Sequence, residues 1–235
     1  MSTPSFPPLF NGQSVEGRTD PFDKACIEAI KGCDAGLVVY NLGANMLRAA
    51  IVFAPDVALK EGMAILPLCG VGFQNALGAL APPEVAVHLD WNGGLRINGA
   101  SCGRFRIAAS GTDPEVEPDW LVVGLELPLW PESDDTGLTP DQTTLYAEGC
   151  VEVDAAALLE SWVKHSLVGI NRWLDEGVAP LHKDWRGLAH GMGGPIENAG
   201  QSGVFLGVDE NFGMLLRDDA AKTCLIPLTS VLETH

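Results

Sequence analysis

Asp90-Trp91-Asn92-Gly93-Gly94 begins the part of the chain that decides the fold. Ile97-Asn98-Gly99-Ala100-Ser101-Cys102-Gly103 follows it, and Trp120-Leu121-Val122-Val123-Gly124-Leu125 comes after that. Turn residues such as Asn-Gly between apolar runs are typical of β-hairpins, and an unbroken aliphatic run is typical of a buried strand. The stretch therefore predicts two strands joined by a tight turn, and then a buried strand.

The sequence on both sides extends this sheet. Apolar and β-branched runs predict strands at residues 37–40, 47–53, 85–91, 95–98, 104–109 and 120–127. Three helices are also expected. Asp20 and Pro21 start the first, apolar residues spaced by three and four predict the second within residues 63–80, and the third runs from the cap Asp154 to Gly177. The apolar face expected for this third helix consists of Leu159, Trp162, Val163, Ile170, Trp173 and Leu174.

The last part of the chain differs in composition, with many glycines and short apolar runs. Residues 191–195 are rich in glycine, follow no strand and open no helix, so they predict a linker. Two apolar runs at residues 203–208 and 212–216, joined by a turn, predict a hairpin. A unit of about forty residues buries too little surface to be very stable alone. We therefore expect two parts, residues 1–188 and residues 189–235.

Charge and cysteine usage narrow the function classes. The 235 residues include 31 acidic and 14 basic side chains, a formal net charge of −17. This charge repels nucleic-acid backbones and anionic lipid surfaces, so neither is an expected partner. The six cysteines form no Cys-x-x-Cys pair, so we expect buried thiols and no metal site. No basic segment followed by an apolar run opens the chain, and the expected location is the cytoplasm.

The order and spacing of these motifs resemble the biotin and lipoate protein ligases. In that family Lys-Trp-Pro-Asn-Asp, Asn-Gly-x-Lys-x-x-Gly and Val-Val-Gly-Ile-Gly-Ile-Asn take the places of the three stretches quoted above. The C-terminal hairpin is similar to the small barrel that ends many biotin protein ligases. The resemblance runs from about Thr19 to Val231 and implies an α+β fold: a mixed β-sheet packed with helices, plus a small C-terminal SH3-like β-barrel.

The resemblance also implies an activity. Such ligases use ATP and magnesium to convert biotin, lipoate or octanoate to an acyl-adenylate, and then pass the acyl group to a lysine of a carrier domain. Fixed cations and aligned backbone amides must neutralise the phosphate and the carboxylate. The implied partners are a small carboxylic acid or adenylate-like ligand and a biotinyl or lipoyl carrier domain, and dimerisation through an exposed strand is common in the family.

The charged residues of the family are missing here. Residues 41–45 lead directly from one expected strand into the next, without the Arg- and Gly-rich loop that holds phosphate. Ala100 stands where the second motif has its lysine, and Asp90 where the first motif has its lysine. No lysine occurs between Lys60 and Lys164, so no shift of register restores either one.

Other polar side chains gather on the face that the family uses for ligands. Strand alternation places His88, Asp90, Arg96, Arg104 and Arg106 on one surface if these strands pair as a hairpin. Arginine suits carboxylate or phosphate binding, and His88 beside Asp90 is a candidate proton-transfer pair. The alternative is a solvated face whose charges keep an exposed strand from aggregating.

Two further positions on this face carry charge. Arg48 either points into the cleft or is a plain charge on an edge strand. Glu126 replaces a family glycine and opposes an anion unless it pairs with an arginine. His190 has no partner in the sequence and is expected at the surface or satisfied internally. The candidate ligand-binding residues are Arg48, His88, Asp90, Trp91, Asn92, Gly103, Arg104, Arg106, Gly124 and Glu126; none is assigned as catalytic or metal-binding.

The function expected first is a divergent ligase-like protein that binds a small carboxylic acid or acyl-adenylate-like ligand, with adenylation lost or altered. Two alternatives stay open. One is an active ligase or acyltransferase in which arginines replace the missing lysine, and which needs ATP, magnesium and biotin or lipoate. The other is a non-catalytic domain that binds a protein partner.

Overall fold

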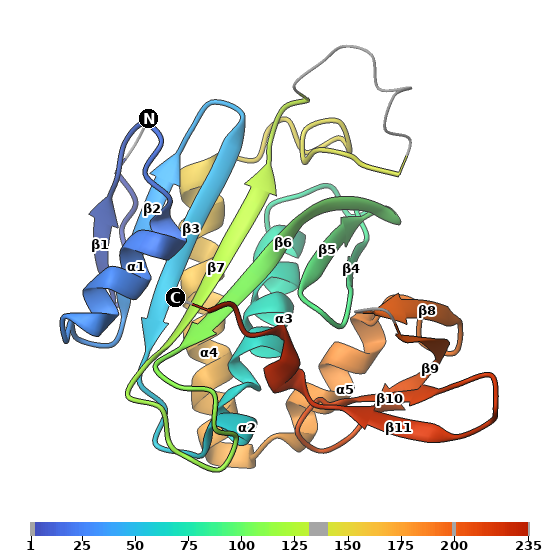
Figure 1. The fold of residues 1–235 in the computed structure, drawn as a ribbon. Coiled ribbons are helices and arrows are strands. Elements are labelled where there is room, and N and C mark those ends of the chain that lie inside the picture. Colours follow the sequence, from blue (N-terminus) through green and yellow to red (C-terminus); the bar gives the residue numbers. More distant parts are fainter. Residues whose placement is uncertain (1–2, 132–140, 199–200, 235) are drawn as a thin grey trace.

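The structure is a computed structural model and describes residues 3–131, 141–198 and 201–234 (Figure 1). Within these residues the centre is a mixed sheet of seven strands, in the order β1-β2-β3-β7-β6-β5-β4. β1 runs parallel to β2, and the other neighbours are antiparallel. The strands are Asn11–Ser14 (β1), Leu37–Leu42 (β2), Met46–Phe53 (β3), Val87–Leu89 (β4), Gly94–Ile97 (β5), Ala100–Ala109 (β6) and Leu121–Pro128 (β7).

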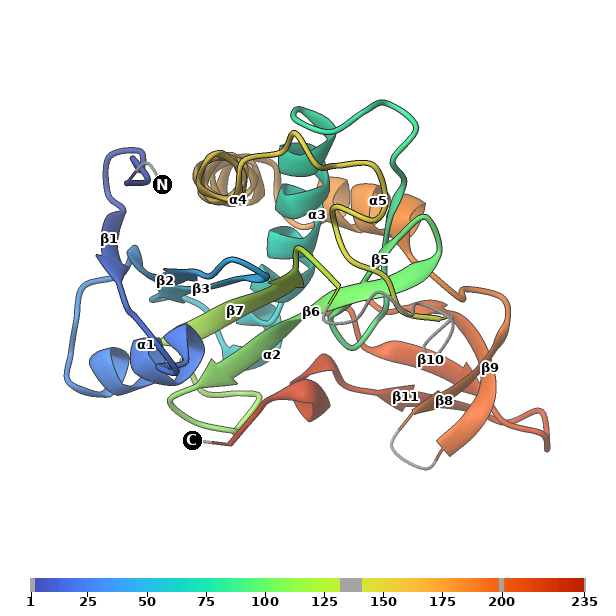
Figure 2. The ribbon, with the colours of Figure 1, turned by 90° about the horizontal axis from the view of Figure 1, so that it is seen from above.

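Helices cover both faces of this sheet unequally. Figure 2 shows α3 and α4 against one face and the short α1 against the other, on the side where the chain ends. The helices span Pro21–Ile30 (α1), Leu59–Gly62 (α2), Ile65–Gly78 (α3), Ala155–Glu176 (α4) and Ala179–Leu188 (α5). We call the face under α3 and α4 the helix face and the opposite one the polar face.

Local sequence explains where the helices begin and end. The Asp20 carboxylate accepts a hydrogen bond from the Phe22 amide at 2.8 Å and caps α1, as predicted. Asp154 does the same for α4 through the Ala157 amide at 2.9 Å. Gly177 ends α4 with a φ of 77°, a conformation that favours glycine.

Strand alternation divides the apolar residues between two cores. The larger core lies on the helix face, where Trp162 of α4 is fully buried and donates its indole N–H to the Cys69 carbonyl at 3.0 Å. Gly72 lets α3 approach α4, because a Cβ there would lie 3.0 Å from the Ser166 hydroxyl. The smaller core lies beneath α1 and includes Phe22, Ala25, Cys26, Val39, Ala50, Val52, Ala108 and Val122.

The C-terminal part adds a four-stranded antiparallel sheet, consistent with a small barrel-like domain, in the order β11-β10-β9-β8. Its elements are Pro195–Asn198 (β8), Gln201–Val208 (β9), Met214–Arg217 (β10), Thr223–Ile226 (β11) and the 3₁₀ turn Leu228–Val231 (η2). Trp91 ties it to the main sheet, because its buried indole donates to the Phe212 carbonyl at 2.7 Å. The Phe212 ring in turn stacks on His182 at 4.0 Å.

The predicted α+β fold class is confirmed, with differences in detail. β1 and α5 were not predicted, and the strand expected at residues 85–91 is reduced to Val87–Leu89. The apolar face predicted for α4 was wrong at Leu174, which is 77% exposed. Pro67 lies in the first turn of α3, where its missing N–H leaves no helical hydrogen bond broken. No helix among the described residues is both long and apolar enough to cross a membrane.

Candidate functional site

The polar face collects charged side chains from five adjacent strands. Arg48 of β3 lies opposite Asn41 of β2 on one side and Glu126 of β7 on the other. Glu126 in turn lies opposite Arg104 of β6, and His88 lies opposite Arg96. The prediction that the three arginines of β5 and β6 share a face with His88 is therefore confirmed by the register.

Arg106 lies at the centre of this face and is surrounded by carboxylates. Its Nε and Nη2 donate to both oxygens of Glu233 at 2.6–3.0 Å, and its Nη1 donates to Asp20 at 2.9 Å and to Glu126 at 3.2 Å. The guanidinium also lies 4.1 Å from the ring centre of Phe22. Burial by itself lowers the pKa of Arg106, but Glu233, Asp20 and Glu126 outweigh it and raise the pKa above its ordinary value. Arg106 is therefore a charge that the chain itself has neutralised.

Arg104 is also paired within the chain. Its Nε donates to Glu126 at 2.7 Å, and this hydrogen bond is the main reason that its pKa is raised. Glu126 thus links Arg104 to Arg106 with its two oxygens. Two guanidinium groups face the three carboxylates of Asp20, Glu126 and Glu233, so this part of the face does not attract an anion.

A second cluster forms around Asp90. Its carboxylate accepts from Arg96 Nε at 2.8 and 3.1 Å, and its Oδ1 lies 3.1 Å from His190 Nδ1. The proton-transfer pair predicted from the sequence joined Asp90 to His88, and this was wrong. The His88 side chain lies on the polar face, as predicted, but its buried Nδ1 has no hydrogen-bond partner among the described residues. His190 meets Asp90 instead, because its backbone pairs with Leu89.

Arg48 differs from the other arginines of the face. Its Nε is buried and has no hydrogen-bond partner within the described residues, and its guanidinium forms no ion pair there. Glu126 lies opposite it in the register, but both oxygens of Glu126 are directed to Arg104 and Arg106. Arg48 is therefore a cation on the polar face that the described chain leaves uncompensated.

The remaining candidates hold the scaffold together. Gly124 makes room for α1, since a Cβ there would lie 2.6 Å from Phe22 Cδ2. Gly103 forms a bulge with a φ of 116°, and a Cβ there would lie 2.2 Å from the Glu126 carbonyl oxygen. Asn92 lies in the turn before β5, and its side chain accepts a hydrogen bond from the Gly94 amide at 3.4 Å. Trp91 is 4% exposed and belongs to the core of the helix face, so it does not line the polar face.

The residues present do not fit the phosphates of ATP. Leu42 ends β2 and Met46 begins β3, and the turn between them is closed by a hydrogen bond from the Gly43 amide to the Met46 carbonyl at 3.0 Å. Ala100 follows the tight Asn98-Gly99 turn and offers no charge where the family has a lysine. Within the described ranges no group of three or more His, Cys, Asp or Glu side chains is arranged to hold a metal ion.

The sequence did not reveal the part that three residues play on this face. Glu233 reaches Arg106 because its amide donates to the Ile107 carbonyl at 2.9 Å, a pairing across 126 residues that leaves no local signal. Phe22 was seen only as part of a helix. Asp20 was identified as a helix cap, but its second oxygen also binds Arg106.

Comparison with known proteins agrees with this architecture. The model of the biotin/lipoate A/B protein ligase family matches residues 6–187, and a domain family of unknown function matches residues 192–234. A curated relative, a biotin–[acetyl-CoA-carboxylase] ligase of Paracoccus denitrificans, is 25% identical over 198 residues, which is 80% of each chain.

Solved structures give the same picture. A biotin protein ligase-like protein of unknown function from a Silicibacter species is 65% identical, with a TM-score of 0.94 over 99% of this chain and 100% of that one. A biotin protein ligase from Aquifex aeolicus shares the fold at 14% identity, with a TM-score of 0.73 over 94% and 96% of the two chains. Because the family model covers most of the chain, including the seven-stranded sheet and α1 to α4, the protein belongs to the biotin/lipoate A/B protein ligase family.

Proposed function

We propose that this protein is a member of the family that binds a small organic acid on the polar face, at Arg48, and does not adenylate it. The observation that carries this proposal is the difference among the arginines of that face. Arg96, Arg104 and Arg106 are each bound to a carboxylate of the chain, whereas Arg48 has no ion-pair partner among the described residues. A buried guanidinium nitrogen without a partner is costly, and an anionic ligand removes that cost.

The loss of adenylation follows from the same face. Transfer to the α-phosphate of ATP requires cations and amides around the phosphates. The tight turn between β2 and β3 offers no such cradle, and Ala100 offers no cation. Phe22 also covers Gly124, which the sequence analysis named as a candidate ligand-binding residue. These observations support binding without activation.

Calorimetry on the wild type and three variants tests the proposal. Biotin, lipoate and octanoate are the probes, each compared with its amide, which has no negative charge. Arg48→Ala is expected to weaken binding of the acid that the wild type prefers by about 10- to 100-fold, the value of a charge-assisted hydrogen bond. Arg48→Lys keeps the charge and is expected to retain part of the affinity. Arg217→Ala is the matched control, because Arg217 is exposed on β10, which belongs to the other sheet.

The outcomes are distinct. Loss of acid binding in Arg48→Ala, with amide binding absent throughout and Arg217→Ala unchanged, supports the site. Equal binding of acid and amide, or the same affinity in Arg48→Ala, removes Arg48 from it. ATP–pyrophosphate exchange, measured with magnesium and each acid in turn, tests the other half, and acid-dependent exchange would refute the loss of adenylation.

An active ligase is the second candidate, favoured by the 25% identity to the Paracoccus denitrificans ligase. It requires an acceptor, so the purified protein is incubated with ATP, magnesium, biotin and a biotinyl carrier domain and probed with streptavidin. A labelled carrier would establish this candidate. A carrier-domain partner, a homodimer and a cytoplasmic location stay predictions of the same kind.

A further inference from the structure

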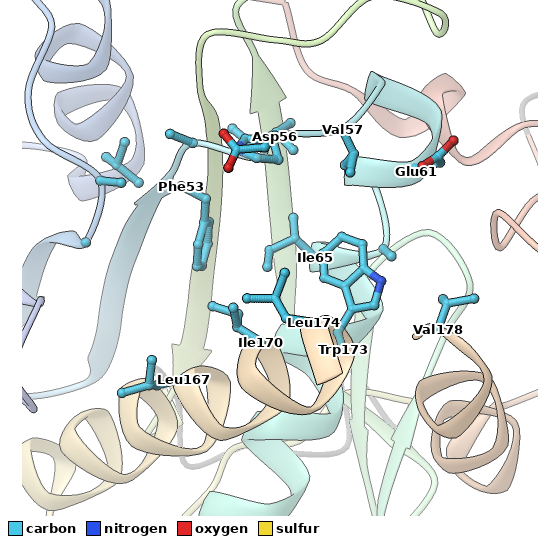
Figure 3. A pocket seen from close by; sticks show the side chains of 18 of the residues that line it. Phe53, Asp56, Val57, Glu61, Ile65, Leu167, Ile170, Trp173, Leu174 and Val178 are labelled. Carbon is cyan, nitrogen blue, oxygen red and sulfur yellow. The ribbon is translucent and has the colours of Figure 1, made fainter. Parts of the chain in front are cut away.

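A large hollow lies away from the polar face, on the helix-face side of the sheet. It measures about 930 Å³ and lies between the end of β3, the start of α3 and the second half of α4. Figure 3 shows Phe53 and Ile65 on one side and Ile170, Trp173 and Leu174 on the other, with their side chains directed into the same space. The volume lies in the range of about 300–1,000 Å³ that is usual for small-molecule sites.

The wall contributed by α4 is apolar and incompletely covered. Leu167, Ile170 and Trp173 are half-buried, and Leu174 is 77% exposed. These residues recur at three- and four-residue spacing, so they form one stripe along the helix. In the first half of α4 the corresponding stripe is covered by α3, and Trp162 is fully buried there. In the second half Ile170 and Trp173 still pack against the edge of the core, and the rest of the apolar stripe faces the hollow.

Charged side chains line part of the hollow, which we call its mouth, and most of them are acidic. Asp56, Glu61 and Glu210 line it, and none of the three forms an ion pair among the described residues. Lys60 also lines it, but its ammonium is held by Glu115, and that hydrogen bond raises the pKa of Lys60. The mouth thus has three carboxylates without an ion-pair partner among the described residues, and its one described cation, Lys60, is already paired with Glu115. Such a field attracts a cation and repels a carboxylate.

Aromatic rings also line the hollow. Phe53 and Trp173 both line the hollow, and Figure 3 shows Trp173 directed into it. Aromatic rings attract ammonium groups through their negative faces, and carboxylates add Coulomb attraction. Apolar walls, aromatic rings and an acidic mouth together match a molecule that has a hydrophobic body and a positive charge.

We propose that this hollow is a second ligand site, separate from the polar face, and that it takes a hydrophobic amine. The apolar body occupies the space between Phe53, Ile65 and the α4 stripe, and the ammonium group lies at the mouth near Asp56 and Glu61. The site is built from different residues than the acid-binding position at Arg48, so neither proposal depends on the other.

Three probes of the same shape and different charge test this site. They are 4-phenylbutylamine, 4-phenylbutanol and 4-phenylbutyrate, titrated into the full chain by calorimetry. The amine is expected to bind most tightly and the carboxylate most weakly, with about fivefold for each unit charge some 4 Å away. Chemical shifts of the Trp173 indole N–H, assigned with Trp173→Phe, locate the bound probe.

Charge variants on α4 separate this site from general hydrophobic binding. Leu174→Lys places a cation at the mouth and, because Leu174 is 77% exposed, is expected to leave the fold intact. It is expected to weaken the amine by about fivefold and to strengthen the carboxylate. Val168→Lys is the control, since Val168 is 55% exposed on the same helix but does not line the hollow. Asp56→Asn combined with Glu61→Gln is expected to weaken the amine and leave the alcohol unchanged.

Several results would overturn the proposal. Equal affinities for the three probes, or no binding of any of them at millimolar concentration, would show that the hollow is not a site for amines. An equal effect of Val168→Lys and Leu174→Lys would show that the probe binds elsewhere. A dimer that forms on concentration and is broken by Leu174→Lys would show that a second copy of the chain covers the stripe instead.

Discussion

Replacing Gly124 with alanine is expected to destabilise the protein because Phe22 already occupies the space above it. The added Cβ would lie 2.6 Å from Phe22 Cδ2, 3.2 Å from Cγ and 3.3 Å from Cβ. Carbon atoms prefer a separation of about 3.5–4.0 Å, so the ring must move by roughly 1 Å. Phe22 is 2% exposed, and the small core around it leaves no room for that movement. We expect a loss of about 1–3 kcal/mol in the free energy of unfolding.

Removing the Phe22 ring is expected to relieve the clash with the new methyl group at residue 124. Phe22→Ala alone is expected to cost about 3–5 kcal/mol, because it empties the centre of the core beneath α1. In the double variant the new methyl group of residue 124 enters the emptied space and meets no ring. The double variant should therefore lose less than the sum of the two single losses, by about 1–3 kcal/mol.

Urea unfolding followed by circular dichroism measures all four proteins of this cycle. Gly111→Ala is the control, since a Cβ at Gly111 would meet nothing within 4 Å. Its free energy of unfolding should stay within about 0.5 kcal/mol of the wild type. Additive losses for Gly124→Ala and Phe22→Ala would refute the argument, because they would show that the Phe22 ring does not press on Gly124.

Three further predictions concern other parts of the molecule. Gly103→Ala should lower the free energy of unfolding by at least about 3 kcal/mol, because it combines strain at a φ of 116° with a clash against the Glu126 carbonyl. Gly99→Ala has strain at a φ of 92° but open space around it and should cost about 1–2 kcal/mol. Urea unfolding measures both, and equal losses would contradict the clash at Gly103. Burial raises the pKa of the thiols of Cys26, Cys69 and Cys102 to about 12. At pH 8 a disulfide reagent should therefore modify the half-buried Cys33 and Cys224 first, and the three buried thiols only in urea. Rapid reaction of all six cysteines in the native protein would show that the core is open. Trp91→Phe leaves the Phe212 carbonyl without its donor and should destabilise the C-terminal sheet by about 1–3 kcal/mol. The loss should appear as faster amide hydrogen exchange in β10. Unchanged exchange in β10 would show that the indole does not anchor the C-terminal sheet.

The positions of most strands of the main sheet and of the helix ends could be read from the sequence because they depend on neighbouring residues, whereas the order of the strands in the sheet was not predicted. Caps such as Asp154, the Asn98-Gly99 turn and the period-two alternation of β6 and β7 act over a few positions. The same local patterns identified the face that holds Arg96, Arg104 and Arg106. Comparison with the family's motifs, which needs no structure, also indicated that the lysine and the phosphate loop of the family are absent.

The state of that face could not be read from the sequence, because it depends on contacts between distant segments. Only the folded chain brings Glu233 and Asp20 to Arg106, and His190 rather than His88 to Asp90. Sequence spacing does not show which carboxylate pairs with which guanidinium, because Coulomb attraction depends on distance in space and not on separation along the chain. The hollow under α4 has the same origin: the apolar stripe is visible in the sequence, but whether a neighbour covers it is decided by where α3 ends and α4 continues. The sequence by itself determined the fold class and the absence of the family's lysine and Arg- and Gly-rich loop, and the tertiary structure decided which of the remaining charges pair with one another.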